Sequence, residues 1–256
     1  MKGEGTLATL DAGLLEACAV GEIAPTGRLR AALNMGNPML AGSRTAMETP
    51  AGVSVDLSRE LARRLGVHVQ FDEFKTAAEA RVAVASGEAD IGFMAIDPDR
   101  AAGIHFTPAY VEIVGSYVVP KGSPIRRNED VDHPGHDVVV GEASAYDLFL
   151  TRHLKQARLL RVPLSEQVVE DMVCGNHTAG AGIRQQLEAD LPRFPGMRLL
   201  DGGFMVIKQA AIMSDRRSEA ARKAFDVFIE WGRSSGFVRG SLDRHGIEGA
   251  QIASRA

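Results

Sequence analysis

The feature that most constrains the fold of this chain is an alternation of strand-like and helix-like segments between residues 28 and 96. Residues Val67–Phe71 alternate apolar and polar side chains, as a strand with one buried face does. Residues Ala89–Ile96 are mostly apolar, as a buried parallel strand is. Such an alternation predicts a parallel sheet with helices on both faces. In chain order the expected elements are a strand at Arg28–Asn34, a helix at 53–65, the strand Val67–Phe71, a helix at Ala77–Ser86 and the strand Ala89–Ile96.

The first helix of this series carries the clearest signals. We interpret Ser54 as its N-cap, because a serine oxygen can accept a hydrogen bond from a backbone N–H of the first turn. Gly66 is a suitable end, since glycine readily adopts the left-handed conformation that terminates a helix. Between them, one apolar stripe is formed by residues spaced four apart: Val53, Leu57, Leu61 and Leu65.

The same pattern starts again after residue 124. It follows an extended run at Ile113–Pro120, and a second extended run lies at Phe204–Ala210. Two α/β units joined by two extended runs predict an α/β protein of two lobes, between which the chain crosses twice. The other expected elements are a weak helix at Leu10–Val20, strands at Val138–Val140, Arg158–Val162 and Thr178–Ile183, and helices at Ser144–Lys155, Ser165–Val173, Asp215–Ser234 and Phe237–His245.

Composition excludes some classes of function. The chain has 256 residues and a net charge of -4, and only 5% of its residues are aromatic, which argues against a nucleic-acid partner. No run of eighteen apolar residues predicts a membrane span. Acidic residues interrupt the first 27 residues, so they do not resemble a secretory signal. We interpret Cys18 and Cys174 as free thiols, with one long-range disulfide as the alternative.

The segment from Ala89 to Tyr117 contains the strongest candidate for a binding residue. Arg100 stands just beyond the end of an expected strand, and its planar guanidinium matches the two oxygens of a carboxylate. Taken alone, an arginine in Asp-Pro-Asp-Arg is most often a solvated residue at a helix end. Its neighbours are therefore informative: Ala95, Asp97, Pro98 and Asp99 precede it, and Phe106, Thr107, Pro108 and Tyr110 follow it.

This order resembles the signature of family 3 bacterial solute-binding proteins, which have the type II periplasmic binding fold. The resemblance implies that Arg100 clamps a ligand carboxylate and that Ala95 and Asp97 line the same site. Members usually carry a hydroxyl residue where this chain has Asp97. We therefore interpret Asp97 as an N-cap before Pro98, a role compatible with contact to a ligand ammonium.

A second candidate lies at the expected strand–helix junction around residue 144. Ser144 and Asp147 have the spacing of a capping box, and the N–H groups at such a helix start can bind an anion. The resemblance implies that this turn faces Arg100 across a cleft, so we predict ligand contacts from Ser144, Ala145 and Tyr146. A plain helix cap is the alternative. Glu142 suits solvent or a cationic ligand group.

Two further positions bear on the ligand. Asn34 and Asn37 follow the first strand, where ligands of open α/β sheets bind, although both also suit an ordinary turn. In amino-acid-binding relatives an aspartate after the strand at 178–183 holds the α-ammonium, and here the matching residue is the neutral Gln185. An organic acid, an amide or a modified amino acid therefore fits as well as a standard amino acid, unless Asp97 or Glu142 replaces that charge.

The resemblance gives the remaining expectations. Residues 1–118 with 206–256 form lobe one, residues 119–205 form lobe two, and hinge closure near Val119 and Met205 buries a carboxylate-bearing ligand. An ABC transporter permease is the implied partner, and we expect a monomer with no cofactor and no metal. The compartment is the periplasm if a signal was removed, or otherwise the cytoplasm. The rival function is a cyclohexadienyl dehydratase-like enzyme, with Glu142 or Asp97 as its acid.

Overall fold

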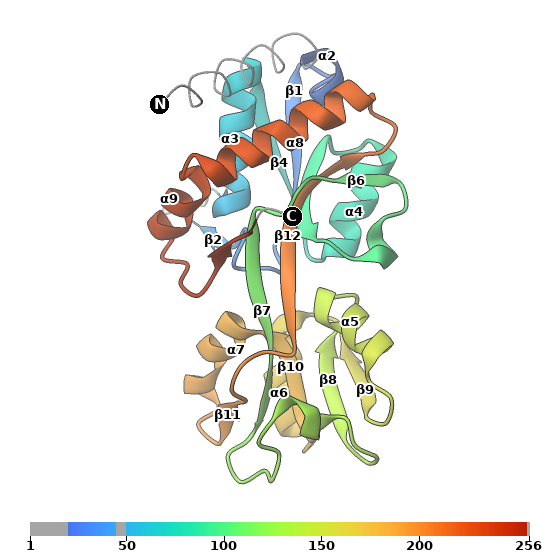
Figure 1. The fold of residues 1–256 in the computed structure, drawn as a ribbon, viewed down its shortest axis with the longest axis vertical. Helices are drawn as coiled ribbons and strands as arrows, with labels where there is room; N and C mark the ends of the chain where they lie inside the picture. Colours follow the sequence, from blue (N-terminus) through green and yellow to red (C-terminus); the bar gives the residue numbers. More distant parts are fainter. Residues whose placement is uncertain (1–19, 45–49, 255–256) are drawn as a thin grey trace. The chain divides into compact units, whose positions relative to one another are not determined.

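The computed structural model describes residues 20–44 and 50–254. They divide into two compact units (Figure 1). The first unit extends to Val111 and resumes at Lys208, and the second is Glu112–Ile207. Strands β7 (Val111–Pro120) and β12 (Met205–Ser214) run through these boundaries, so the chain crosses between the units twice. The lobe boundaries expected from the sequence, after residue 118 and before residue 206, fall inside the same two strands.

The first unit contains the parallel sheet that the sequence predicts. Strand β1 (Arg28–Asn34) pairs in parallel with both β4 (His68–Phe74) and β5 (Ile91–Ala95), and β12 pairs antiparallel with β5. The strand order is β4-β1-β5-β12, and β6 (Ile104–Phe106) also pairs with β12.

Two helices cover opposite faces of this sheet, as predicted. Ala32 of β1 packs in a core cluster with Ala80 and Val84 of α4 (Ala77–Ser86). The next residue, Leu33, packs with Val55 of α3 (Val53–Leu65). Because successive side chains of a strand point to opposite faces, α3 and α4 must lie on different sides of the sheet.

The start of α3 differs from the expectation. Its N-cap is Gly52 rather than Ser54, and Gly52 has a φ of 130°. A Cβ at Gly52 would lie 2.3 Å from the carbonyl oxygen of Leu40, so no side chain fits there. Ser54 lies within the helix, where its N–H donates to the same Leu40 oxygen at 3.0 Å. The predicted apolar stripe is buried, and Gly66 ends the helix in the left-handed conformation.

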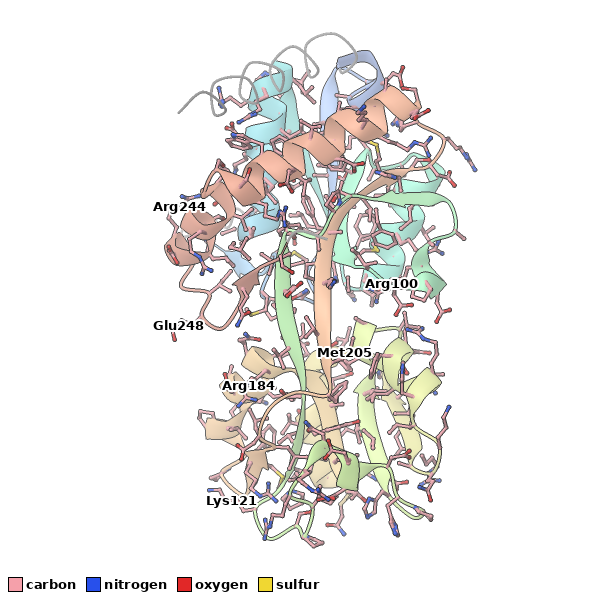
Figure 2. All side chains as sticks on the ribbon, viewed as in Figure 1. Arg100, Lys121, Arg184, Met205, Arg244 and Glu248 are labelled. Atoms are coloured by element: carbon pink, nitrogen blue, oxygen red, sulfur yellow. The ribbon has the colours of Figure 1, made fainter. Side chains whose placement is uncertain are left out.

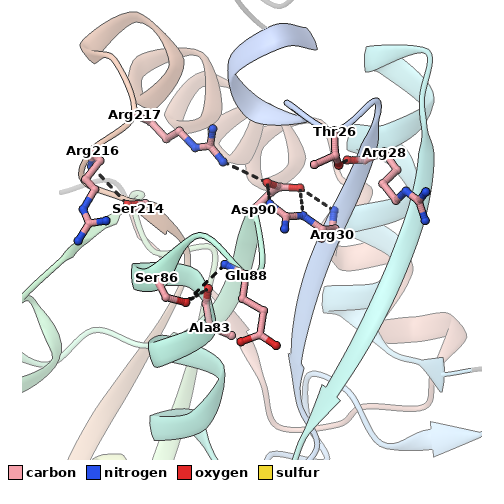
Figure 3. Close-up of polar contacts among 10 residues, drawn as sticks. All are labelled: Thr26, Arg28, Arg30, Ala83, Ser86, Glu88, Asp90, Ser214, Arg216 and Arg217. Carbon is pink, nitrogen blue, oxygen red and sulfur yellow. Dashed lines mark hydrogen bonds and ion pairs between the residues drawn. The ribbon is translucent and has the colours of Figure 1, made fainter.

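A buried ion-pair network joins the amino-terminal ends of β1 and β5, two interior strands of the first sheet (Figure 3). The Asp90 carboxylate precedes β5 and is fully buried. It accepts hydrogen bonds from Nη2 of Arg30 in β1 at 2.7 Å and from Nη2 of Arg217 at 3.0 Å. Arg217 lies in the loop after β12, so one carboxylate joins three segments that are distant in the sequence.

The second unit has its own sheet in the order β7-β10-β8-β9. Strand β8 (Asp137–Gly141) is parallel to β9 (Arg158–Val162) and to β10 (Ala179–Ile183), and β7 is antiparallel to β10. Three helices connect or follow these strands: α5 (Ala145–His153), α6 (Val168–Cys174) and α7 (Arg184–Asp190). Val118, Val139, Val168 and Leu187 form its buried core.

The C-terminal part returns to the first unit. Helix α8 (Glu219–Ser234) packs on α3, where the Arg64 guanidinium lies 3.4 Å from the centre of the Trp231 ring. Helix α9 (Phe237–Arg244) follows it. The short elements are α2 (Val20–Ile23), β2 (Ser43–Arg44), β3 (Pro50–Ala51), β11 (Met197–Leu199) and β13 (Gln251–Ile252). The helix expected at Leu10–Val20 lies outside the described residues except for Val20, and so does Cys18, whereas Cys174 is exposed.

Candidate functional site

Arg100 belongs to a tight turn that Asp97 caps. The turn is the 3-10 helix η1 (Pro98–Arg100), which follows the end of β5. Asp97 Oδ1 accepts a hydrogen bond from the Asp99 N–H at 2.9 Å, and the Arg100 N–H donates to the Asp97 carbonyl at 3.0 Å. Asp97 is therefore the N-cap that we expected from the Asp-Pro order.

The Arg100 side chain is buried within the first unit, with 6% of the residue exposed (Figure 2). Its Nη1 donates to the carbonyl oxygen of Ala95 at 3.3 Å. Burial lowers the pKa of Arg100 to about 10, while the negative charge of Asp97 raises it and the positive charge of Arg81 lowers it further. Arg100 is still a cation at neutral pH, and its desolvation favours a site for an anion.

The Phe-Thr-Pro-Ala-Tyr segment after Arg100 secures β12 to the first unit. Thr107 exchanges two hydrogen bonds with Ala211, one from its own N–H at 3.0 Å and one to its Oγ1 at 3.1 Å. The Tyr110 N–H donates to the Gln209 carbonyl at 2.9 Å. The Tyr110 ring is fully buried edge-on against Phe93. These residues support the sheet beside the candidate site.

Asn34 and Asn37 both act in the turn after β1. The Oδ1 of Asn34 accepts from the Gly36 N–H at 3.1 Å, and the Oδ1 of Asn37 accepts from the Met39 N–H at 3.2 Å. A Cβ on Gly36 would lie 2.6 Å from the Lys75 carbonyl oxygen, so this turn requires glycine there. The side-chain oxygens of both asparagines thus have structural partners.

In the second unit, the turn between β8 and α5 is held by reciprocal capping. Ser144 is the N-cap, and its Oγ accepts from the Asp147 N–H at 3.0 Å. The Asp147 Oδ2 accepts from the Ala143 N–H at 2.9 Å, one residue earlier than in a standard capping box. Ala143 has a φ of 55°, a conformation that residues with a Cβ seldom adopt.

The neighbouring candidates differ in exposure. Glu142 is exposed, whereas Ala145 is half-buried at the first helical position. Tyr146 is buried, and its hydroxyl donates to Ser165 Oγ at 2.7 Å. Burial raises the pKa of Tyr146, and hydrogen bonds from neighbours including Ser165 oppose this. The side chain of Tyr146 therefore supports the second unit, and its backbone N–H is the part suited to a ligand.

Arg161, which no sequence motif indicates, balances the charge at the start of α5. Asp147 is buried, and its Oδ1 accepts from Arg161 Nε at 3.0 Å and from Thr151 Oγ1 at 3.2 Å. Without this guanidinium, an acidic residue in the first helical turn would repel an anion. The Arg161 contact keeps the helix start suitable for negative charge.

The end of β10 carries a cation and an amide. Gln185 is half-buried in the first turn of α7. The preceding Arg184, which the sequence analysis did not single out, donates from Nη1 to the Gly202 carbonyl at 2.8 Å and from Nε to Glu188 at 3.0 Å. No acidic side chain occupies residues 183–186.

Two further features bear on the kind of site that the described parts of the chain can form. Among these residues, no helix is both long and apolar enough to cross a membrane. Nor do three or more His, Cys, Asp or Glu side chains gather there in a group that could hold a metal ion.

Comparison with known proteins identifies the family. Residues 30–244 match the bacterial extracellular solute-binding proteins, family 3. The chain belongs to this family. The resemblance seen in the sequence is thereby confirmed, and so is the expected α/β fold with two crossings. A search of curated proteins found no match.

Solved structures of family 3 type share the fold at low sequence identity. A putative binding component of an ABC transporter from Wolinella succinogenes, complexed with lysine, has 18% identity and a TM-score of 0.73 over 85% of this chain and 95% of its own. A solute receptor for L-cysteine from Neisseria gonorrhoeae has 20% identity and a TM-score of 0.73, covering 88% and 93%. An ancestral amino-acid-binding protein, described as a precursor of cyclohexadienyl dehydratase, has 18% identity and a TM-score of 0.72, covering 87% and 96%.

Proposed function

We propose that this family 3 protein captures a small carboxylate-bearing solute and delivers it to an ABC transporter. The observation that carries the proposal is the buried guanidinium of Arg100 at the carboxyl end of β5. Desolvation of this cation is costly, and a ligand carboxylate would offset the cost through a charge-assisted, bidentate hydrogen bond. Ala95 at the end of β5 and Asp97 at the start of the turn both precede Arg100.

The second unit contributes the start of α5. Backbone N–H groups at Ser144, Ala145 and Tyr146 suit an anionic or acceptor group, since Arg161 balances the charge of Asp147. A ligand that contacts both units favours a closed arrangement, because only differential contacts shift such an equilibrium. Bending of β7 and β12 where these strands cross between the units would permit the closure.

The ligand class follows from the end of β10. Two of the similar structures are named for lysine and L-cysteine. In this chain Gln185 is neutral and Arg184 is a cation, so a ligand ammonium finds no opposite charge at residues 183–186. We propose an organic acid, an amide, a modified amino acid, or a standard amino acid whose ammonium pairs with Asp97 or Glu142. The family name places its members outside the cell, and we place this chain in the periplasm.

The similarity to a dehydratase precursor raises an enzymatic alternative. Its acid would be Asp97 or Glu142. Asp97 Oδ1 is engaged by the Asp99 N–H, and Glu142 is exposed, so binding without catalysis is the better-supported function. Incubation with prephenate and arogenate tests this alternative, and formation of phenylpyruvate or phenylalanine above a buffer control would establish it.

Replacement of Arg100 tests the binding function. A thermal-shift panel of amino acids, organic acids and amines first identifies a binder, and calorimetry then measures its affinity. We expect Arg100→Ala to weaken binding by about 30-fold or more, corresponding to loss of about 2 kcal/mol from a buried charged contact. Arg233→Ala is the matched control, because Arg233 is an arginine of the same unit whose side chain is only 8% exposed and pairs with Glu230. Equal affinities of Arg100→Ala and the parent protein would refute the clamp.

A further inference from the structure

Gln209 is a buried amide whose side-chain oxygen meets no donor in the described part of the chain. The residue belongs to β12, just inside the first unit, and is 1% exposed. Within the described residues, its Oε1 has no hydrogen-bond partner. A buried acceptor without a donor forfeits the hydrogen bonds it would make in water, so such groups are rare in folded proteins.

The strand register places Gln209 beside the candidate site. Gln209 lies directly opposite Ala95 in the antiparallel pairing of β12 with β5, so the two side chains share one face of the sheet. Ala95 is the last residue of β5, and its carbonyl oxygen accepts the hydrogen bond from Arg100 Nη1 at 3.3 Å. The amide therefore lies next to the strand end that carries the Arg100 turn.

The buried hydroxyls of Tyr110 and Ser54 likewise lack a hydrogen-bond partner among the described residues, although they face each other. The Tyr110 side chain is on the same face as Gln209, since its ring packs against Phe93, and Phe93 lies opposite Ala211. Burial raises the pKa of Tyr110, and the Ser54 hydroxyl that faces it opposes this. Among these three groups, Gln209 is the one whose residue pairs with Ala95 at the end of β5.

We propose that Gln209 Oε1 accepts a hydrogen bond from an N–H group of the solute whose carboxylate binds Arg100. This inference rests on the proposed function and narrows it. The solute would carry an amide or ammonium N–H beside its carboxylate. A neutral amide can accept such a bond without a full opposite charge, which agrees with the neutral residue at Gln185.

Gln209→Met tests the proposal in two measurements, because methionine has a similar length and no side-chain oxygen that needs a donor. The first is the melting temperature without solute, which we expect to equal or exceed that of the parent protein. The second is the affinity for probes from a panel of the twenty L-amino acids, propionate, lactate and succinate. Affinity for a nitrogen-bearing probe should fall roughly 10-fold, while affinity for propionate or succinate should not change.

Asn128→Leu is the control, since Asn128 also has a buried amide oxygen without a partner among the described residues but belongs to the second unit, whereas Gln209 belongs to the first. It should leave every affinity unchanged. A lower melting temperature for Gln209→Met with unchanged affinity would overturn the proposal and assign Gln209 to the fold. If Arg100→Ala abolishes binding and Gln209→Met leaves it intact, the role of Gln209 is overturned and the proposed function stands. If no probe of the panel binds the parent protein, both the proposed function and this inference are contradicted.

Discussion

Ala143 adopts an unfavourable backbone conformation directly before the start of α5, where a ligand is proposed to bind. Its φ of 55° is unfavourable for a residue with a Cβ, yet its N–H donates to Asp147 at 2.9 Å. Asp147 is held in turn by Arg161 from β9. Contacts from a neighbouring strand thus maintain a strained turn in front of α5, and such strain is common at functional sites.

Replacing Arg161 tests this chain of contacts. We expect Arg161→Gln to lower the free energy of unfolding by about 2 kcal/mol, because the buried Asp147 carboxylate loses its counter-charge. The loss stays below that of a fully buried pair, since the Arg161 side chain is 40% exposed. Arg158→Gln on the same strand is the control, as Arg158 is 70% exposed and pairs with Asp137 at the surface. Urea unfolding measures both, and equal losses would contradict the argument.

At the scale of elements, the Asp90 network joins the starts of β1 and β5 to the loop before α8 (Figure 3). The Arg30 N–H also donates to Asp90 Oδ2 at 2.9 Å, so the carboxylate fixes a backbone group as well as two side chains. Hydrogen bonding to Asp90 raises the pKa of Arg30, although partial burial opposes this.

Two adjacent arginines provide a matched test of the network. We expect Arg217→Ala to reduce the free energy of unfolding by about 1–2 kcal/mol, because it removes a charged hydrogen bond to a fully buried carboxylate. Arg216 is exposed, so Arg216→Ala should change stability by less than about 0.5 kcal/mol. Chemical denaturation with a fluorescence readout distinguishes them. A similar small loss of stability for both variants would show that Arg30 alone is enough to stabilise the buried Asp90 carboxylate.

The sequence predicted long elements better than short ones. Strand β1, helix α4 and strand β9 have the expected bounds, because composition and periodicity are local properties. The strands of two or three residues were missed, because they carry too little periodicity: β2, β3, β6, β11 and β13. Helix α7 was missed because it follows β10 with no turn between them. The N-cap of α3 was wrong because Gly52 is required by its approach to Leu40, a contact that no local pattern encodes.

For the molecule as a whole, acidic residues in both units link stability to pH. Burial raises the pKa of Asp56, but hydrogen bonds from Ser241, Arg244 and His245 outweigh it and hold the pKa below its usual value. In the second unit, the pKa of Asp132 is also lowered: desolvation raises it, and hydrogen bonds from three backbone N–H groups outweigh that effect.

Stability should therefore decline in acid. A carboxyl group with a lowered folded pKa stabilises the fold above its unfolded value, about 3.9 for Asp, and that contribution is lost as pH falls through the folded pKa. We expect the urea midpoint to change little from these groups between pH 7 and about pH 5 and to fall as the pH is lowered below about 4, and we expect Asp56→Asn to show a smaller fall than the parent protein. An unchanged pH dependence in Asp56→Asn would exclude Asp56 as a contributor.

The candidate site was only partly predictable from the sequence. Arg100 and Ser144 follow strand ends within recognisable motifs, so their local structure could be anticipated. Arg161 and Gln209 come from strands 14 or more positions away, and only the sheet register brings them beside Asp147 and Ala95. Asn34 and Asn37 suited both a turn and a ligand, and only the folded turn shows that their side-chain oxygens accept backbone hydrogen bonds.

The discontinuous make-up of the first unit has a consequence for biosynthesis. Its sheet needs β12 beside β5, and more than a hundred residues separate the two strands. The second unit, in contrast, is one uninterrupted stretch. During translation the second unit can finish folding before β12 has left the ribosome. Until then β5 of the first unit is an unpaired edge strand, and such edges are prone to aggregation.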